Sequence, residues 1–462
     1  MKTHQSKWIF PRLALVVLSL LAAMWQSAVA QTAVPPQTDE YRTHGAQLMR
    51  MLGAREYGDV VGQFDAQMTQ ELPKEKLSKL WEGLVTQVGS FQKVGTTEVT
   101  EESGGYHVVA MNLVFERSSE GDAQVVFDKD GRIAGLYFGP QPTESANEWK
   151  TPGYADPAGQ QEVAVSVAHG AWHLPGTLTL PKGKGPFPAV VLIPGSPPID
   201  QDATVGPNKI FKDLAWGLAN RGIAVLRYTK RTHQFGAGLG GGFASFTLRE
   251  ELDDDASSAV ALLSGRSEID RRRIFLVGHS MGGIAASRVA ANYARIAGMA
   301  LMGTPSEDPL TVLVKRVEGM AGAGGPNDEV DSNMRVLKQL RGGALNTAGT
   351  FDLFGQRFLV GYWNDLGNYA AGTGAAKLSV PLLVLVAGHD ASVPADDFDR
   401  WKKILAGRQS ATVKLYPALF HLFLPSTAAG TGDAPEDWER PAHVPLDVVN
   451  DLASWILGKT IA

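Results

Sequence analysis

The chain has 462 residues, enough for two domains, and 44% of them are apolar, which is ordinary for a folded protein with a large core. The 43 Lys and Arg against 48 Asp and Glu give a net charge of −5, and this mild acidity, without a basic stripe or a stacking motif, argues against a nucleic-acid partner. There are no cysteines, which excludes disulfides, a thiolate nucleophile and cysteine-based metal sites.

The first residues form a segment typical of a secretory signal peptide. Three basic residues within the first 12 precede an apolar run from Leu13 to Met24, and Ala28-Val29-Ala30 matches the small-residue cleavage pattern. The competing interpretation is a retained membrane anchor, but the run is shorter than a bilayer span. We therefore expect residues 1–30 to be removed and the mature protein to be exported, to the periplasm or outside the cell, with no membrane contact after cleavage.

Residues 31–139 predict a small α+β domain. From about Thr43 to Val88, apolar residues recur at helical spacing. Short strands with turn signals follow, among them Tyr106–Phe115 and a pair joined by a hairpin turn at Asp128–Gly131. Helices first and an antiparallel sheet afterwards indicate an α+β arrangement. We find no catalytic group of residues in this domain.

A segment rich in Pro and Gly, residues 140–161, predicts a linker. Beyond it, residues 162–462 begin with an apparent antiparallel strand pair and then alternate apolar strands with helices. The apolar strand runs are Ala189–Ile193, Ile223–Tyr228, Ile274–Val277, Met299–Met302, Leu382–Val386 and Val413–Tyr416. Such runs form mostly parallel sheets covered by helices on both faces, and functional residues collect at the carboxyl ends of the strands.

The alternation lapses at about residues 305–378. This insert is Gly-rich, and its pattern predicts helices at Leu310–Met320, Met334–Leu340 and Phe351–Tyr369. Because the insert lies between two core strands, we expect a lid over the site. Its aromatic residues either shape a substrate pocket or pack the lid against the body, and packing is the more common role of a single aromatic residue. The charged run Arg249–Asp255, earlier in the chain, is typical of the solvated start of a helix.

The strongest chemical signal lies at Arg271–Gly283. An apolar strand run there meets the Gly-x-Ser-x-Gly motif of residues 278–282, and a small-residue helical stretch follows. A strand–turn–helix of this kind holds a serine hydroxyl at a sharp elbow above the sheet. The backbone N–H of the next residue then faces the place where an oxyanion would form, at the positive end of the helix. We predict Ser280 as a nucleophile and Met281 as an oxyanion donor.

A serine nucleophile needs a base and an acid that orients it, and in this arrangement the acid precedes the base along the chain. Asp390 comes just past a strand end in a tight turn. Its rivals fall in the next helix and are typical of helix-start charges: Asp396, Asp397 and Asp399. His421 follows the last strand, and His443, in a Pro-rich loop before the final helix, is the alternative. We predict Asp390 as the acid and His421 as the base.

The second oxyanion donor is expected in the loop after Ala189–Ile193. Gly195 supplies a tight turn there, and the N–H of Ser196 is the predicted donor. Pro197 and Pro198 stiffen the loop and remove two N–H groups. No histidines and carboxylates occur at metal-ligand spacing, so we expect no metal and no other cofactor.

On the elbow, the acid turn and the final histidine in this order, residues 162–462 resemble the α/β-hydrolase superfamily. The stretches at 174–178, 213–218, 222–228 and 278–283 are similar to those of exported bacterial serine hydrolases that carry a small N-terminal domain of unknown function. Members are described as esterases or as dienelactone-hydrolase-like or peptidase-like. The resemblance implies a mostly parallel sheet with a helical lid insert. The N-terminal part is similar to nuclear-transport-factor-two-like folds.

The chain departs from this group in the oxyanion loop. Members commonly have His-Gly-Ser-Gly-Pro followed by Asp-Arg-Asp, whereas this chain has Pro-Gly-Ser-Pro-Pro at Pro194–Pro198, followed by Asp200-Gln201-Asp202. The replacements bear on the shape of the hole, and so on the substrate class. They leave the three triad positions untouched.

Together these patterns predict a serine hydrolase that cleaves carboxylic esters through an acyl-enzyme intermediate, with a small-molecule acyl ester as its substrate. A peptidase or amidase of the same fold is one alternative, although peptidases of this fold usually carry larger additional domains. A non-catalytic binding module with a decayed site is another, and the altered oxyanion loop is the feature that favours it.

Overall fold

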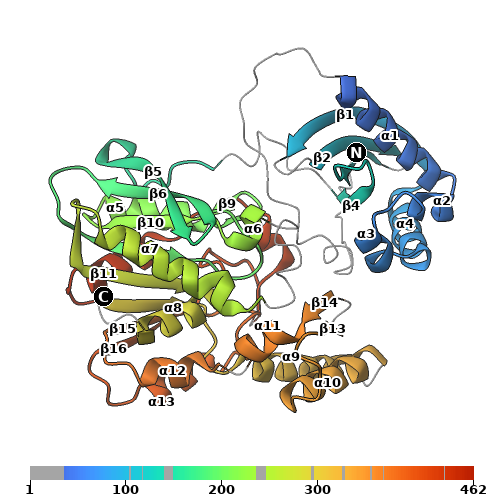
Figure 1. Ribbon diagram of the computed structural model, residues 1–462. Helices are drawn as coiled ribbons and strands as arrows, with labels where there is room; N and C mark the ends of the chain where they lie inside the picture. Colours follow the sequence, from blue (N-terminus) through green and yellow to red (C-terminus); the bar gives the residue numbers. More distant parts are fainter. Residues whose placement is uncertain are drawn as a thin grey trace, which may run out of the picture. The chain divides into compact units, whose positions relative to one another are not determined.

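The computed structural model describes residues 36–461 except 103–105, 117, 140–148, 236–245, 293–295, 325–327, 354–355, 368 and 431. The predicted signal peptide, residues 1–30, therefore lies outside the described residues, as does much of the predicted linker. The chain divides into two compact units, Met1–Pro142 and Thr143–Ala462. Figure 1 follows the elements of each unit along the chain.

The first unit packs helices against one antiparallel sheet. Its helices are α1 (Pro36–Gly53), α2 (Tyr57–Val61), α3 (Ala66–Glu71) and α4 (Lys74–Val88). Its sheet has the order β1 (Phe91–Glu102), β2 (Tyr106–Phe115), β3 (Ser118–Phe127) and β4 (Ile133–Gly139). Alternate residues of β2, such as Val109 and Met111, pack with Trp81 of α4, because successive strand side chains point to opposite faces. The predicted α+β arrangement is confirmed.

The second unit is built on an eight-stranded sheet with the order β16-β15-β12-β11-β7-β10-β6-β5. The strands are β5 (Gln160–His169), β6 (Trp172–Pro181), β7 (Phe187–Ile193), β10 (Ala224–Tyr228), β11 (Ile269–His279), β12 (Gly298–Met302), β15 (Leu382–Ala387) and β16 (Ala411–Tyr416). From β10 to β16 every neighbouring pair is parallel, whereas β6 pairs antiparallel with both β5 and β10. The predicted, mostly parallel sheet is confirmed.

Helices cover both faces of this sheet. The longer ones are α5 (Ile210–Ala219), α7 (Asp254–Ser264), α8 (Met281–Asn292), α13 (Asp397–Ile404) and α14 (Leu446–Ile456). Val190 and Leu192 of β7 share a core with α5 and α14, whereas Val191 and Ile193 share one with α7 and α8. Both faces of the central strand are thus buried, which explains its unbroken apolar sequence. In the described part of the chain, no helix combines the length and the apolar character that crossing a membrane requires.

Short elements connect these layers. They are the helices α6 (Arg231–Phe235) and α12 (Ala371–Ala376), the 3-10 turns η1 (Pro157–Gly159) and η4 (Pro435–Trp438), the π-helical turn η3 (Arg249–Asp253), and the two-residue strands β8 (Thr204–Val205) and β9 (Asn208–Lys209).

The insert between β12 and β15 forms a small layer of its own, drawn in orange tones in Figure 1. It contains α9 (Pro309–Gly324), α10 (Asp328–Arg341), β13 (Thr350–Leu353), β14 (Gln356–Leu359) and α11 (Val360–Gly367). The helix predicted over Phe351–Tyr369 is wrong in its first half, which is a β-hairpin. Phe351 and Leu353 are buried while Thr350 and Asp352 are exposed, and this period of two is the pattern of a strand. Phe354 lies outside the described residues.

Candidate active site

The residues predicted from the sequence lie at the edge of the sheet near the point where the strand order changes direction. From β7 the chain adds β10 on one side, then returns to place β11 on the other side. In open α/β sheets, such a reversal leaves a crevice beyond the carboxyl ends of the two strands. Ser196 lies in the loop after β7, and Ser280 follows β11 directly.

Ser280 occupies a sharp elbow between β11 and α8. Its φ of 55° lies in the left-handed region, which costs a non-glycine residue conformational energy. The elbow is close-packed: a Cβ on Gly278 would lie 2.2 Å from the carbonyl oxygen of Gly282, and a Cβ on Gly282 would lie 2.1 Å from that of Ile193. Both motif glycines are therefore required by contact. The helix α8 begins at Met281, so its N-terminal N–H groups lie beside the serine.

The predicted acid and base form a hydrogen-bonded pair. Nδ1 of His421 lies 2.8 Å from Oδ2 of Asp390, and both residues are buried. The other oxygen of Asp390, Oδ1, accepts the backbone N–H groups of Ser392 at 2.8 Å and Val393 at 3.2 Å, which fixes the carboxylate. Burial acts to lower the pKa of His421, but the charge and hydrogen bond of Asp390 outweigh it, and the pKa is raised above its usual value.

The turn that carries His421 is tied to the elbow. Nε2 of His279, the residue before the serine, donates to the backbone carbonyl of His421 at 2.8 Å, and the two rings lie 4.8 Å apart. A carbonyl can only accept, so His279 carries its proton on Nε2. Burial lowers the pKa of His279 to about 4 and keeps this ring neutral. His279 thus joins the base turn to the nucleophile turn.

The alternative base, His443, and two of the alternative acids, Asp396 and Asp397, bond other residues. His443 bonds to the buried Asp213 of α5 at 3.0 Å through Nδ1. Asp396 pairs with Arg400, and Asp399 is exposed. Asp397 lies in the first turn of α13, as predicted, and is fully buried, where it accepts the backbone N–H of Ser306 at 3.1 Å. Burial raises the pKa of Asp397 to about 6.

The loop after β7 approaches the elbow closely. A Cβ on Gly195 would lie 3.0 Å from Cβ of Ser280, so this close contact favours glycine in the turn. Ser196 is exposed, whereas Gly195 is buried. Behind the loop, Nζ of Lys230 donates to the carbonyl oxygen of Gly195 at 3.0 Å. Lys230 was not among the residues predicted from the sequence. It lies directly after a core strand, where functional residues collect, and this position is the signal that could have identified it.

The expectation of a solvated charge run at Arg249–Asp255 is wrong for three of its members. Glu251 and Asp255 are 5% and 0% exposed, and the side chain of Asp253 is 14% exposed. Asp255 forms an ion pair with the buried Arg231. These acids face inward because each meets a cation from another segment, Lys230, Arg231 or Arg288. Buried charges are expected to be paired, and these are.

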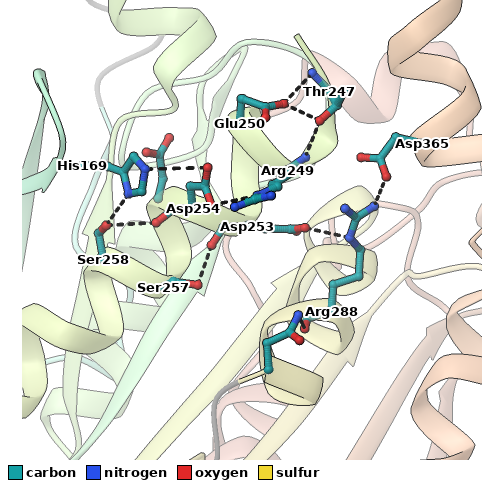
Figure 2. A network of polar contacts seen from close by, with 12 residues as sticks. His169, Thr247, Arg249, Glu250, Asp253, Asp254, Ser257, Ser258, Arg288 and Asp365 are labelled. Atoms are coloured by element: carbon teal, nitrogen blue, oxygen red, sulfur yellow. Dashed lines mark hydrogen bonds and ion pairs between the residues drawn. The ribbon is translucent and has the colours of Figure 1, made fainter. Parts of the chain in front are cut away.

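Figure 2 shows how one acid of this run, Asp253, is linked through Arg288 to the insert between β12 and β15. Arg288 of α8 lies between Asp253, at 2.7 Å, and Asp365 of the lid helix α11, at 2.9 Å. The guanidinium also lies 5.8 Å from the ring centre of Tyr369. Burial raises the pKa of Asp253 to about 7, although Arg288 acts to lower it. A single arginine on the nucleophile helix thus bridges the body and the lid.

No group of three or more His, Asp or Glu residues suited to a metal ion occurs among the residues described. What the site offers is a strained serine, a buried histidine oriented by a carboxylate, and N–H groups at a helix start. These are the parts that acyl transfer through a serine requires. The strand order and the elbow define the class of the second unit as an α/β-hydrolase.

Comparison with known proteins agrees with this class. Residues 208–426 match a hydrolase family described as serine aminopeptidase, S33, and residues 46–136 match a family described as a protein of unknown function, DUF3887. Esterase EstD of Thermotoga maritima is 31% identical to this chain over 395 residues, which cover 85% of the chain and 89% of that esterase. The chain belongs to this esterase family of α/β-hydrolases.

Solved structures with a related fold are more distant. Est1E from Butyrivibrio proteoclasticus is 14% identical with a TM-score of 0.42, and the match covers 64% of this chain and 99% of that chain. A putative dienelactone hydrolase from Klebsiella pneumoniae is 16% identical with a TM-score of 0.38, over 64% of this chain and 98% of that chain.

Proposed function

We propose that this chain is a serine hydrolase that cleaves carboxylic esters through an acyl-enzyme intermediate. The observation that carries the proposal is the pair Asp390–His421, joined at 2.8 Å and tied through His279 to the elbow of Ser280. Membership of an esterase family supports a small-molecule acyl ester as the substrate.

The chemistry follows from the geometry. With its Nδ1–H donated to Asp390, the neutral His421 keeps a lone pair on Nε2. That nitrogen takes the proton of Ser280 as the serine oxygen attacks the ester carbonyl carbon. The N–H groups of Met281 and Ser196 stabilise the oxyanion that forms. The ester C–O bond then breaks, and the leaving alkoxide takes the proton from His421. Water, activated by the same base, finally releases the acid and restores Ser280.

The direct test is Ser280→Ala. We expect this variant to lose hydrolysis of p-nitrophenyl acetate and covalent labelling by a fluorophosphonate probe, since both need the same nucleophile. Ser287→Ala is a matched control, because Ser287 lies on the same helix and bonds only the carbonyl of Gly283, at 3.0 Å. Turnover or labelling that persists in Ser280→Ala at the wild-type level would refute the proposed nucleophile.

A peptidase or amidase is the second candidate, favoured by the match of residues 208–426 to the family described as serine aminopeptidase. Parallel assays with p-nitrophenyl esters and aminoacyl p-nitroanilides separate the two candidates. We expect the ester substrates to have a kcat/KM at least about tenfold higher, and the reverse order would favour the peptidase. Probe labelling of Ser280 would also count against a decayed, non-catalytic site.

We further propose that the mature protein is exported and begins at Gln31. The basic residues, apolar run and small residues of the first 30 positions support this proposal. Fractionation of expressing cells followed by N-terminal sequencing tests it. Protein that stays in the cytoplasm with its first 30 residues intact would contradict it.

A further inference from the structure

Lys230 is a buried cation whose hydrogen bonds go to a single loop and a single carboxylate. Its side chain is 1% exposed. Nζ donates to the carbonyl oxygens of Gly195 at 3.0 Å and Pro197 at 3.4 Å, and lies 2.8 Å from Oε1 of Glu251. The three ammonium protons thus meet three acceptors. A buried charge is costly unless it is paired in this way, so the arrangement constrains both the loop and the carboxylate.

The carbonyl of Gly195 belongs to the same peptide group as the N–H of Ser196. The cis peptide bonds of the described residues are Gly185-Pro186 and Ser196-Pro197, so the Gly195–Ser196 bond is trans. In a planar trans peptide the C=O and the N–H point in opposite directions. A carbonyl held toward Lys230 therefore directs the N–H of Ser196 away from Lys230. The ammonium also draws electron density from the carbonyl, which makes the N–H a stronger donor.

Glu251 connects the same network to the lid. Its Oε1 accepts from Lys230 and, at 3.0 Å, from the hydroxyl of Thr232. Its Oε2 lies 2.5 Å from the hydroxyl oxygen of Tyr362, on the lid helix α11. Burial, together with the charge of Glu251, raises the pKa of Tyr362 well above its usual value, so the phenol keeps its proton and donates it to the carboxylate.

Tyr362 also contacts Met281, the predicted oxyanion donor of the elbow. Its hydroxyl oxygen lies 3.2 Å from Sδ of Met281, the residue whose backbone N–H begins α8. The single hydroxyl proton goes to the stronger acceptor, the carboxylate, so the sulfur contact is one of packing. The network Lys230–Glu251–Tyr362 therefore touches the loop of Ser196 at one end and the side chain of Met281 at the other.

We propose that Lys230 is a positioning residue of the oxyanion hole, and that Tyr362 links the state of the lid to both of its donors. This inference rests on the proposed function, since it assigns a role within that reaction. When α11 is seated, Glu251 is held by Tyr362 and in turn holds Lys230, so the N–H of Ser196 points into the hole. When α11 lifts, the carboxylate loses one donor and the loop loses part of its support.

The test compares variants that remove the network without leaving a charge buried alone. Lys230→Met with Glu251→Gln removes both charges, and Tyr362→Phe removes only the link to the lid. We expect the double variant to lower kcat about 10- to 100-fold with KM changed less than about threefold, because an oxyanion donor acts mainly on the transition state. We expect Tyr362→Phe to lower kcat about three- to tenfold.

A neighbouring ion pair supplies the matched control. Arg231 and Asp255 are as deeply buried as Lys230 and Glu251, with side chains 4% and 1% exposed. No hydrogen bond joins either of them to residues 194–198 in the described structure. The double variant Arg231→Met with Asp255→Asn should therefore keep kcat per active site within about threefold, with active sites counted by fluorophosphonate titration and folding checked by melting temperature.

A second readout separates positioning from a general loss of structure. A trifluoromethyl ketone binds Ser280 as a tetrahedral adduct and therefore uses the oxyanion hole. We expect its inhibition constant to rise in the Lys230 and Tyr362 variants in proportion to the fall in kcat/KM, whereas Arg231→Met with Asp255→Asn leaves it unchanged. Wild-type kcat and inhibition in the Lys230 double variant would overturn this inference alone, while an active Ser280→Ala would overturn the proposed function first. Should the double variant not fold, Tyr362→Phe still tests the network at its lid end, and wild-type kcat and inhibition there would overturn the proposal that this network positions the donors.

Discussion

Two close aspartate–histidine pairs in the hydrolase unit make an instructive comparison. His421 bonds Asp390 through Nδ1 at 2.8 Å, and His443 bonds Asp213 through Nδ1 at 3.0 Å. Both aspartates are buried, at 8% and 0% exposure. The two pairs share the residue types and the ring atom, and their distances are similar. Their difference is therefore one of place in the fold.

Asp213 sits on α5, where its oxygens also accept from Nε1 of Trp149 at 2.7 Å and from the backbone N–H of Val444 at 2.9 Å. These bonds attach the segment before α14, and the chain near Trp149, to α5. Asp390 instead accepts N–H groups from its own turn, beyond the carboxyl end of β15. Its histidine is tied through His279 to the turn that carries Ser280. The same kind of pair therefore lies beside the elbow in one case and joins a loop to a helix in the other.

The largest expected effect separates the two histidines. We expect His421→Gln to lower kcat by about 10⁴- to 10⁶-fold, because the serine loses its base. The matched variant His443→Gln removes one partly exposed hydrogen bond, so we expect kcat near the wild-type value and a loss of about 1 kcal/mol in the free energy of unfolding. Steady-state kinetics and denaturant unfolding measure both. Equal losses of kcat in the two variants would contradict the assignment of His421 as the base.

A second experiment uses pH to distinguish the aspartates. The folded pKa of His421 is raised, and the reaction needs the neutral ring, so kcat/KM should rise with pH around a pKa above about 6.5. Asp390→Asn should lower kcat by about 10⁴-fold. It should also move this rise to lower pH, because the negative charge that raises the pKa of His421 is gone. Asp213→Asn should leave the position of the rise unchanged. If Asp390→Asn left the pH of this rise unchanged, the titrating group would not be His421.

The same pKa fixes the sign of a stability effect. Because the folded pKa of His421 lies above its unfolded value, the pair with Asp390 stabilises the fold fully below about pH 6.5. That contribution is lost as the pH rises through the folded pKa. The active form of the enzyme is thus the one in which this pair contributes less to stability, and unfolding of Asp390→Asn against pH should lack this decline.

The smallest expected effect concerns the charged pair between α8 and the lid. Asp365→Asn removes one partner of Arg288, and partly exposed pairs contribute about 0.5–1 kcal/mol. We expect amide hydrogen exchange in α11 to become about two- to fivefold faster, with kcat/KM within about threefold of the wild type. The control is Arg341→Gln, since Arg341 pairs with Asp308 inside the insert and not with the body. Unchanged exchange in α11 would show that the pair between Arg288 and Asp365 does not hold the lid in place.

Much of the fold was predictable because its signals are local. The strand runs of the hydrolase unit are apolar on both faces, and the structure has a strand at every predicted run. Five of these strands are longer than predicted, and β10 begins one residue later than predicted. The hairpin in the lid was missed because Phe351–Leu353 is too short to compete with the helical pattern around it. The buried acids at Glu251–Asp255 were missed because their basic partners lie in other segments of the chain, which charge spacing along the run does not reveal.

The sequence by itself determined the elbow of Ser280, since the contacts of Gly278 and Gly282 lie within a strand–turn–helix and its immediate neighbour strand. It also determined that the acid, Asp390, precedes the base, His421, along the chain. Only the tertiary structure decided that Asp390 and His421 meet while Asp213 and His443 meet elsewhere, and that Lys230 lies behind the loop of Ser196. The reason is physical: turns depend on short-range sterics, whereas side chains far apart in sequence are brought into contact only by the register and twist of the sheet.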